Sequence, residues 1–159
     1  MTVRVRPHVW SLRSQRGMAV VESALRGAAL RPGFRVVRFS VQGNHLHLVV
    51  EAASAAALTS GMKALAIRLA RGMNGLMGRR GPVLEDRYHA HVLRTPAEVR
   101  RALAYIADNF AGHARRWGEA MPEGFRDRFG SAERPELVEK GETWLLRRAM
   151  TSAESSDGE

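Results

Sequence analysis

The sequence predicts an α+β protein in which helices pack on one face of an antiparallel sheet. Three observations support this class: the order of periodic segments, a tight turn at residues 42–44 between two strand patterns, and a well-marked helix start at Thr95. The predicted order is strand, helix, two strands, helix, strand, helix, which is that of a split, ferredoxin-like sheet. Helices on one face would leave the other face open to ligands.

The first two elements are an edge-like strand and an amphipathic helix. Residues 2–9 alternate valine with arginine before and around Pro7, as edge strands do. Residues 13–30 place Met18, Val21 and Leu25 at helical spacing, and Pro32-Gly33 ends the pattern.

A hairpin follows. Residues 34–41 put Val37, Phe39 and Val41 on one face of a strand, and the next strand begins immediately after Gln42-Gly43-Asn44. This turn predicts that Gly43 adopts a positive φ.

The second half begins with a long helix over residues 54–77, whose stripe of Leu and Met residues marks a core-facing side. Residues 88–93 read as a short strand. Thr95-Pro96-Ala97-Glu98 then has the pattern of a capping box with proline at the first helical position, which predicts a helix to about His113.

The C-terminal part has a weaker pattern. We expect one domain over residues 1–130 and a tail over residues 131–159, with a short helix at about residues 142–150 and disorder from Thr151 to Glu159. No apolar run is long enough for a membrane span or resembles a secretory signal, which predicts a cytoplasmic protein.

Charge and cysteine content narrow the function. The net charge is +9, and no acidic residue occurs between Glu51 and Glu85, a stretch that carries Lys63, Arg68, Arg71, Arg79 and Arg80. Such a surface attracts polyphosphate, so nucleic acid is the expected partner. The alternative explanation is codon usage, because 23 of the 25 basic residues are arginine, and a GC-rich genome would also produce this excess. The chain has no cysteine, so any metal must be held by histidine, carboxylate or amide groups.

His45 and His47 are the strongest candidates for a metal site. Because side chains alternate along a strand, the two imidazoles point to one face, about 7 Å apart, while Leu46, Leu48 and Val50 point to the other. Two such imidazoles can share one cation. The alternative is a polar strand face turned toward solvent.

Tyr105 and Asn109 are neighbours on one face of the capped helix, because residues four apart lie one above the other. Near two imidazoles, the amide oxygen of Asn109 could be a third ligand of a divalent ion, and the phenolate of Tyr105 could attack a phosphate. The alternative is that Tyr105 packs at a helix edge with its hydroxyl on a backbone group.

Three motifs together carry a family resemblance: Gly43-Asn44-His45-Leu46-His47-Leu48-Val49-Val50-Glu51, then Asp86-Arg87-Tyr88-His89, then Tyr105-Ile106-Ala107-Asp108-Asn109. They resemble the single-tyrosine HUH transposases, especially the REP-associated tyrosine transposase branch. The resemblance covers nearly the whole chain, including the stretch from Thr143 to Arg147.

The resemblance implies an HUH endonuclease fold and a nuclease and strand transferase for single-stranded DNA. It implies that His45, His47 and Asn109 hold Mg²⁺ or Mn²⁺, and that Tyr105 attacks the scissile phosphate to form a 5′-phosphotyrosine link. It also implies hairpin recognition, for which the basic helix and nearby residues are the candidates: Lys63, Arg68, Arg71, Arg79, Arg80, Arg87 and His89. Some relatives have glutamine where this chain has Asn109, and whether the protein forms a homodimer stays open.

Two other functions stay open. A non-catalytic nucleic-acid binding module could use a similar sheet, but such modules stack bases on strand aromatics, and only 6% of this chain is aromatic. A metal-dependent hydrolase could activate water, with Glu51 as the one candidate base. A second His-x-His pattern, His89-Ala90-His91, follows Tyr88; because neighbours on a strand face opposite ways, we assign Tyr88 to structure or DNA contact and His89 to the margin of the site.

Overall fold

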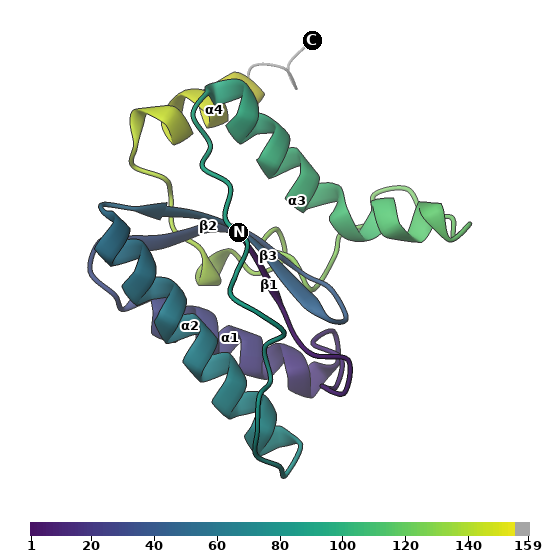
Figure 1. Cartoon of the computed structure of the whole chain (residues 1–159). Coiled ribbons are helices and arrows are strands. Elements are labelled where there is room, and N and C mark those ends of the chain that lie inside the picture. The colour runs from purple at the N-terminus through teal and green to yellow at the C-terminus, as the bar shows by residue number, and fades with distance from the viewer. Residues whose placement is uncertain (155–159) are drawn as a thin grey trace.

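The computed structural model describes residues 1–154 and contains three strands and four α-helices (Figure 1). In chain order, the elements are β1 (Thr2–Arg4), α1 (Gln15–Ala29), β2 (Phe34–Val41), β3 (His45–Ala52), α2 (Ala55–Leu76), α3 (Pro96–Arg116), the 3₁₀ turn η1 (Pro135–Leu137) and α4 (Trp144–Glu154). No helix in this part of the chain is both long and apolar enough to cross a membrane.

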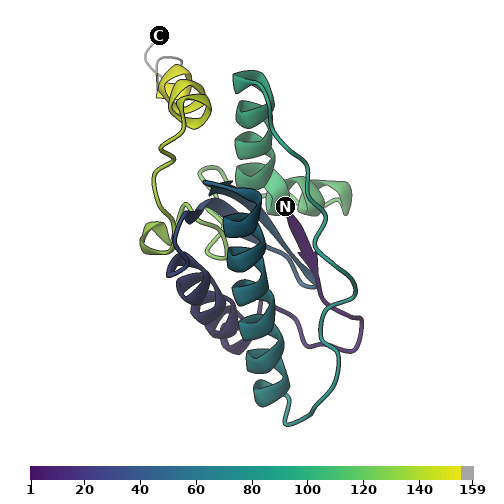
Figure 2. The same ribbon diagram turned by 60° about the vertical axis from the view of Figure 1, so that its left-hand side comes forward.

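The strands form one antiparallel sheet in the order β1-β3-β2. Helices α1 and α2 cover one face, whereas α3 crosses the other face with α4 packed beside it (Figures 1 and 2). The predicted α+β class with an antiparallel sheet is confirmed. The expectation that all helices lie on one face is wrong, because α3 covers the face that was expected to stay open.

Strand β3 is buried from both sides, and its side chains alternate between two cores. Leu46 and Leu48, each about 1% exposed, pack in the core under α1 and α2. Val49 packs on the opposite face in a second, smaller core, which is formed by Val37, Val99, Ile106, Leu146 and Ala149. The predicted separation of the leucines from the histidines is therefore confirmed, and it directs His47 toward α3.

A β-bulge changes the pattern in β2. The register with β3 shifts between Val36 and Arg38, so that one residue of β2 is inserted without a partner. As a result, Val36 and Phe39 join the core under α1 and α2, whereas Val37 joins the core under α3. The prediction that Val37 shares a face with Phe39 and Val41 is therefore wrong.

The N-terminal strand and the segment at residues 88–93 are less regular than predicted. Strand β1 ends at Arg4, and the segment at residues 88–93 forms no strand in the described part of the chain. A single antiparallel bridge joins His89 to Thr2. The segment therefore lies beside β1, where a fourth strand would run, but it makes only one ladder pair there.

The turn between β2 and β3 closes without a left-handed residue at position 43 or 44. The Gln42 N–H donates to the carbonyl of His45, and the carbonyl of Gly43 accepts from the Leu12 N–H. The predicted positive φ of Gly43 is wrong, because contacts with the segment before α1 set the conformation of this turn.

The long helices begin as predicted. The Ser54 hydroxyl caps α2, and Thr95 and Glu98 form the predicted capping box at the start of α3. Helix α3 continues to Arg116, three residues beyond the predicted end. These starts are encoded locally, since a cap needs only side chains within one turn of the helix.

The residues after 130 pack on the same sheet and cores as the rest of the chain. The Ser131 and Glu139 N–H groups donate to the carbonyls of Phe39 and Val36 along the outer edge of β2. The predicted short helix begins at Trp144 and extends to Glu154, so the disorder expected from Thr151 does not apply to residues 151–154. Residues 155–159 lie outside the described residues.

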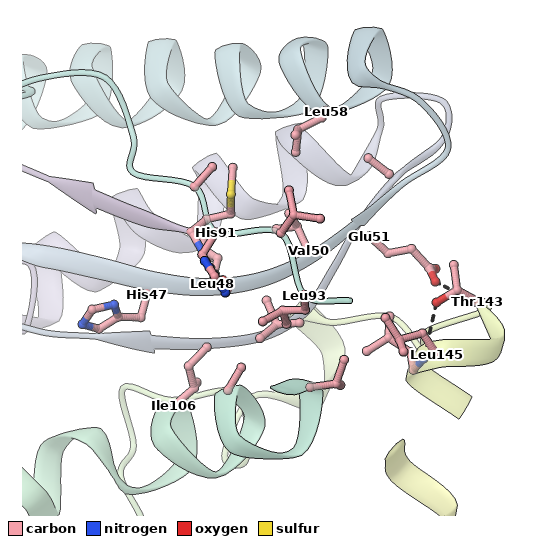
Figure 3. A pocket seen from close by; sticks show the side chains of 18 of the residues that line it. His47, Leu48, Val50, Glu51, Leu58, His91, Leu93, Ile106, Thr143 and Leu145 are labelled. Carbon is pink, nitrogen blue, oxygen red and sulfur yellow. Dashed lines mark hydrogen bonds between the residues drawn. The ribbon is translucent and has the colours of Figure 1, made fainter. Parts of the chain in front are cut away.

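Glu51 holds the N-terminus of α4 against β3. Its carboxylate, buried on the α3 side of the sheet, accepts from the Glu142 N–H at 3.0 and 3.1 Å and from the Thr143 N–H at 2.6 Å (Figure 3). Arg35 donates to the same carboxylate at 3.2 Å. Burial alone would raise the pKa of Glu51, but these hydrogen bonds outweigh it and hold the pKa below its ordinary value.

We expect Glu51→Ala to lower the free energy of unfolding by about 3 kcal/mol, because it leaves two backbone donors and Arg35 without their buried partner. The exposed ion pair of Glu85 with Arg4 is the control, and Glu85→Ala should cost less than about 1 kcal/mol. Urea denaturation at pH 7 measures both. Since folding lowers the pKa of Glu51, the contribution of Glu51 to the free energy of unfolding should disappear as the pH falls below 4.5. Equal effects of the two variants would contradict this role for Glu51.

Candidate active site

His45 and His47 lie side by side on the face of β3 that α3 crosses. Their ring centroids are 4.6 Å apart, and the ring of His47 is 5.4 Å from the ring of Tyr105 on α3. Figure 3 shows His47 between the sheet and this helix. The packing of Ile106 against Val49 in the second core sets this distance, because it fixes the helix over β3. The structure thus brings together the predicted imidazole pair and the predicted phenol.

Asn109 and His113 continue the row that Tyr105 begins. Residues 105, 109 and 113 are each four apart and follow one side of α3. His113 lies at the far end of this row, with its ring centroid 6.4 Å from that of His45. The motifs in the sequence did not single out His113. The signal that could have identified His113 is its position eight residues after Tyr105, which is two steps of four along the same helix.

Both histidines use the same ring nitrogen, Nδ1, for a hydrogen bond. The Nδ1 atom of His45 is 2.7 Å from the Asn44 Oδ1, and the Nδ1 atom of His47 is 3.0 Å from the Thr2 hydroxyl. These bonds leave Nε2 as the free nitrogen of each ring, an arrangement common in histidines that bind a metal. The contact with Thr2 depends on the pairing of β1 with β3, which the sequence did not reveal.

Three buried polar atoms of the predicted site residues have no hydrogen-bond partner among the described residues: His47 Nε2, Asn109 Oδ1 and Asn109 Nδ2. Asn109 is only 4% exposed. An unpaired buried polar group costs about 1–3 kcal/mol, so a group of this kind calls for a partner such as an ordered water, an ion or a ligand. Two neutral imidazole nitrogens and an amide oxygen are suitable donors for a divalent cation.

A cluster of three or more His, Cys, Asp or Glu side chains suited to a metal does not occur in residues 1–154. The ligand set expected from the sequence, His45, His47 and the Asn109 amide, contains only two residues of these types.

The imidazoles are kept neutral at ordinary pH. Burial, together with the neighbouring charges of His45, the N-terminus, His113 and Arg4, lowers the pKa of His47 to about 4. Burial also lowers the pKa of His45, and the charges of Arg4 and His113 act in the same direction. Because a metal binds only the neutral imidazole, this environment keeps both side chains in the form that can act as ligands.

The two tyrosines have different surroundings. The side chain of Tyr105 is 52% exposed beside His47, so its hydroxyl is accessible to a large substrate. Tyr88 is partly buried and packs against the core under α1 and α2. The assignment of Tyr88 to a structural role agrees with this position.

An apolar cavity of about 580 Å³ adjoins the site. It extends from His47 and Tyr105 along the edge of β3 to Glu51 and Thr143, and it is lined mainly by aliphatic side chains from β3, α3 and residues 90–93 (Figure 3). At its far end, Glu51 is fully engaged by α4 and is separated from His47 by about 13 Å along the strand.

The predicted DNA-contacting residues fall in two places. Helix α2 and the turn after it lie on the sheet face opposite Tyr105, and they carry Lys63, Arg68, Arg71, Arg79 and Arg80. His89 pairs with Thr2 at the edge of the candidate site, and Arg87 lies two residues before it. Of these residues, only His89 is joined to the strand that borders the imidazole pair.

We expect NMR titration of the native protein to place the midpoint of His47 near pH 4. An unfolded histidine titrates near pH 6.5, so the unfolded state binds more protons between pH 6.5 and 4, and the free energy of unfolding should decrease as the pH falls through this range. His47→Asn should flatten that decrease, whereas His8→Asn, at an exposed position outside the site, should not. A midpoint of His47 at or above 6.5 would contradict a neutral imidazole held between β3 and α3.

No protein-family model matches the chain, and neither does any curated protein. One solved structure, a REP-associated tyrosine transposase bound to a REP hairpin, matches with a TM-score of 0.60 and 14% sequence identity. The match covers 89% of this chain and 83% of the transposase chain. The chain therefore shares the fold of that transposase.

Proposed function

We propose that the protein is a transposase-like nuclease and strand transferase for single-stranded DNA, which depends on a divalent metal and acts through Tyr105. The observation that carries this proposal is the exposed phenol of Tyr105 beside the ring of His47, whose buried Nε2 has no partner among the described residues. The amide of Asn109, one turn further along α3, is likewise buried and unpaired in this part of the chain. A structural neighbour that binds a REP hairpin supports DNA as the substrate. The biological process would be DNA transposition or the processing of REP-like elements.

Each residue of the site has a distinct role in this proposal. His45, His47 and Asn109 would hold Mg²⁺ or Mn²⁺, which when bound polarises the scissile phosphate. Thr2 and Asn44 orient the two rings through their Nδ1 atoms. Tyr105 is the nucleophile, and its position on a capped, packed helix reduces the entropy cost of bringing the phenol to the phosphate.

The proposed reaction is a transesterification. The Tyr105 oxygen forms a bond to phosphorus while the bond from phosphorus to the 3′-oxygen breaks, which produces a 5′-phosphotyrosine and a DNA end with a 3′-hydroxyl. In the net reaction, the phenolic proton is transferred to that hydroxyl. The number of phosphoester bonds is unchanged, so a 3′-hydroxyl can reverse the reaction without ATP.

The basic residues of α2 would bind DNA away from the scissile phosphate. The groove between α1 and α2 is lined by Arg31, Arg68 and Arg71 and by no acidic side chain of the described residues. Since it lies on the sheet face opposite Tyr105, it suits phosphates of a segment other than the one that is cleaved, such as a hairpin stem.

The two alternative functions have less support. A hydrolase would need a base near the imidazoles, but Glu51 is about 13 Å from His47 along β3 and accepts three hydrogen bonds from the start of α4. A module that stacks bases on its sheet would need exposed strand aromatics. Phe34 and Phe39 are instead buried under α1 and α2.

We expect Tyr105→Phe to abolish a covalent protein–DNA adduct, because the phenylalanine ring keeps the packing but has no nucleophilic oxygen. Tyr88→Phe is the matched control and should leave the adduct intact, since Tyr88 is partly buried against the core under α1 and α2. The assay is a denaturing gel after incubation with single strands from the flanking genomic DNA. Peptide mapping that found the nucleotide on Tyr88 would overturn the assignment.

We expect His47→Ala and Asn109→Ala to reduce both Mn²⁺ binding and cleavage by about a hundred-fold or more, while DNA affinity changes little, because arginines elsewhere supply it. Thr2→Val, which removes only the bond to Nδ1, should weaken Mn²⁺ binding about ten-fold or more. Calorimetry measures metal affinity without reference to activity. His91→Ala, from the second His-x-His pattern, is the control. Undiminished cleavage by His47→Ala in EDTA would refute the metal site.

A further inference from the structure

Trp117 is an exposed aromatic side chain at the end of the helix that carries Tyr105. It is the C-cap residue of α3 and is 73% exposed. Its ring lies 5.8 Å from the ring of His113, with an angle of 38° between their planes. Residues 105, 109, 113 and 117 are spaced by four, and because each such step turns about 40° around the helix axis, the row winds from Tyr105 to the indole rather than staying on one face.

The surroundings of Trp117 are cationic and polar. The last turn of α3 carries His113, Arg115 and Arg116. Arg115 pairs with Asp108, whereas Arg116 makes no ion pair or hydrogen bond with another side chain of the described residues. Residues 115–119 are all exposed, and Trp117 is their one apolar side chain. A protein-docking surface would need a continuous apolar patch, and a single ring among charges favours a nucleic acid instead.

The position of Trp117 suits a strand that continues from the active site. Twelve residues separate it from Tyr105, which would be about 18 Å along a straight helix, but α3 bends between its two ends (Figures 1 and 2), so the distance is shorter. At most about five nucleotides cover it at the spacing of a B-DNA strand. The imidazole of His113 lies between the two positions, within reach of His45.

We propose that Trp117 is a base-stacking platform for single-stranded DNA that leads away from the phosphate at Tyr105. This inference rests on the proposed function, because the proposed function places the scissile phosphate at Tyr105. It concerns the binding of DNA and not the cleavage reaction. A base stacks on the open face of the indole, and Arg116 contacts the adjoining backbone. Stacking on an aromatic ring is independent of sequence, since every base has a π-face.

Binding of oligo(dT) of about 20 nucleotides, longer than the site of a single binding fold, tests the platform. Trp117→Ala should weaken binding about ten-fold or more, and Trp117→Phe should retain most of the affinity, because a phenyl ring still stacks. The matched control is Trp144→Ala: Trp144 is 69% exposed, but it lies at the start of α4, beside Glu51 at the other end of β3. A blunt duplex of the same length should bind Trp117→Ala and the wild type equally.

Fluorescence locates the contact directly. The chain has three tryptophans, so the double variant Trp10→Phe/Trp144→Phe leaves Trp117 as the single indole. Its emission should be quenched by saturating oligo(dT) and unaffected by the duplex. Three results would each overturn the proposal. The emission of Trp117 could stay unchanged, Trp117→Ala could bind oligo(dT) within about two-fold of wild type, or Trp117→Ala could lose as much affinity for duplex DNA as for oligo(dT).

The adduct assay separates this inference from the proposed function. Adduct formation by Trp117→Ala with unaltered kcat/KM on a cleavable strand would refute the platform and leave Tyr105 as the nucleophile. Quenching of Trp117 by single strands in a protein that forms no adduct would refute the proposed chemistry and support the platform. Tyr105→Phe should leave the quenching unchanged.

Discussion

The burial of β3 on both faces is the constraint on which the rest of the structure depends. A strand has two faces, and here each is covered by a separate core: Leu46 and Leu48 pack under α1 and α2, and Val49 packs under α3. A shift of one residue in the register of β3 would exchange the positions of the leucines with those of His45 and His47. The imidazoles would then be buried in an apolar core. The hydrophobic pattern of β3 therefore determines which side of the sheet bears the polar site.

The position of α3 follows from the same strand. Val99 and Ile106 pack with Val37 and Val49, and Leu146 and Ala149 of α4 complete that core. Because Ile106 is fixed on the sheet, its neighbour Tyr105 lies beside the ring of His47, and Asn109 follows one turn later. Glu51 contributes from the other end of β3, since its carboxylate holds the start of α4 and so supports the core on which α3 rests.

The site retains polar groups at the expense of stability. The buried amide of Asn109 and the Nε2 atom of His47 have no partner in residues 1–154, although each such group costs about 1–3 kcal/mol. Burial and nearby positive charge lower the pKa of His47 to about 4, so its imidazole stays neutral at pH values well below 6.5. The unpaired groups oppose stability, and a cation would accept electron pairs from these neutral donors, although the positive charges of the N-terminus and Arg4 act against it. Unfavourable local energetics of this kind are common where a protein binds a ligand.

The sequence alone determines the features that depend on interactions between residues close together in the chain. The alternation of β3, the Thr95 capping box and the length of α2 each depend on residues within a few positions, and the structure agrees with them. The spacing of Tyr105 and Asn109, one turn apart on α3, has the same local origin. Tertiary structure decided the rest. The bulge at Val36, the turn at Gly43, the position of α3 over the open face, and the contact between Thr2 and His47 all depend on residues far apart in the chain. Such features follow from the packing of whole elements, because backbone hydrogen bonds and side-chain volumes must be satisfied together in three dimensions.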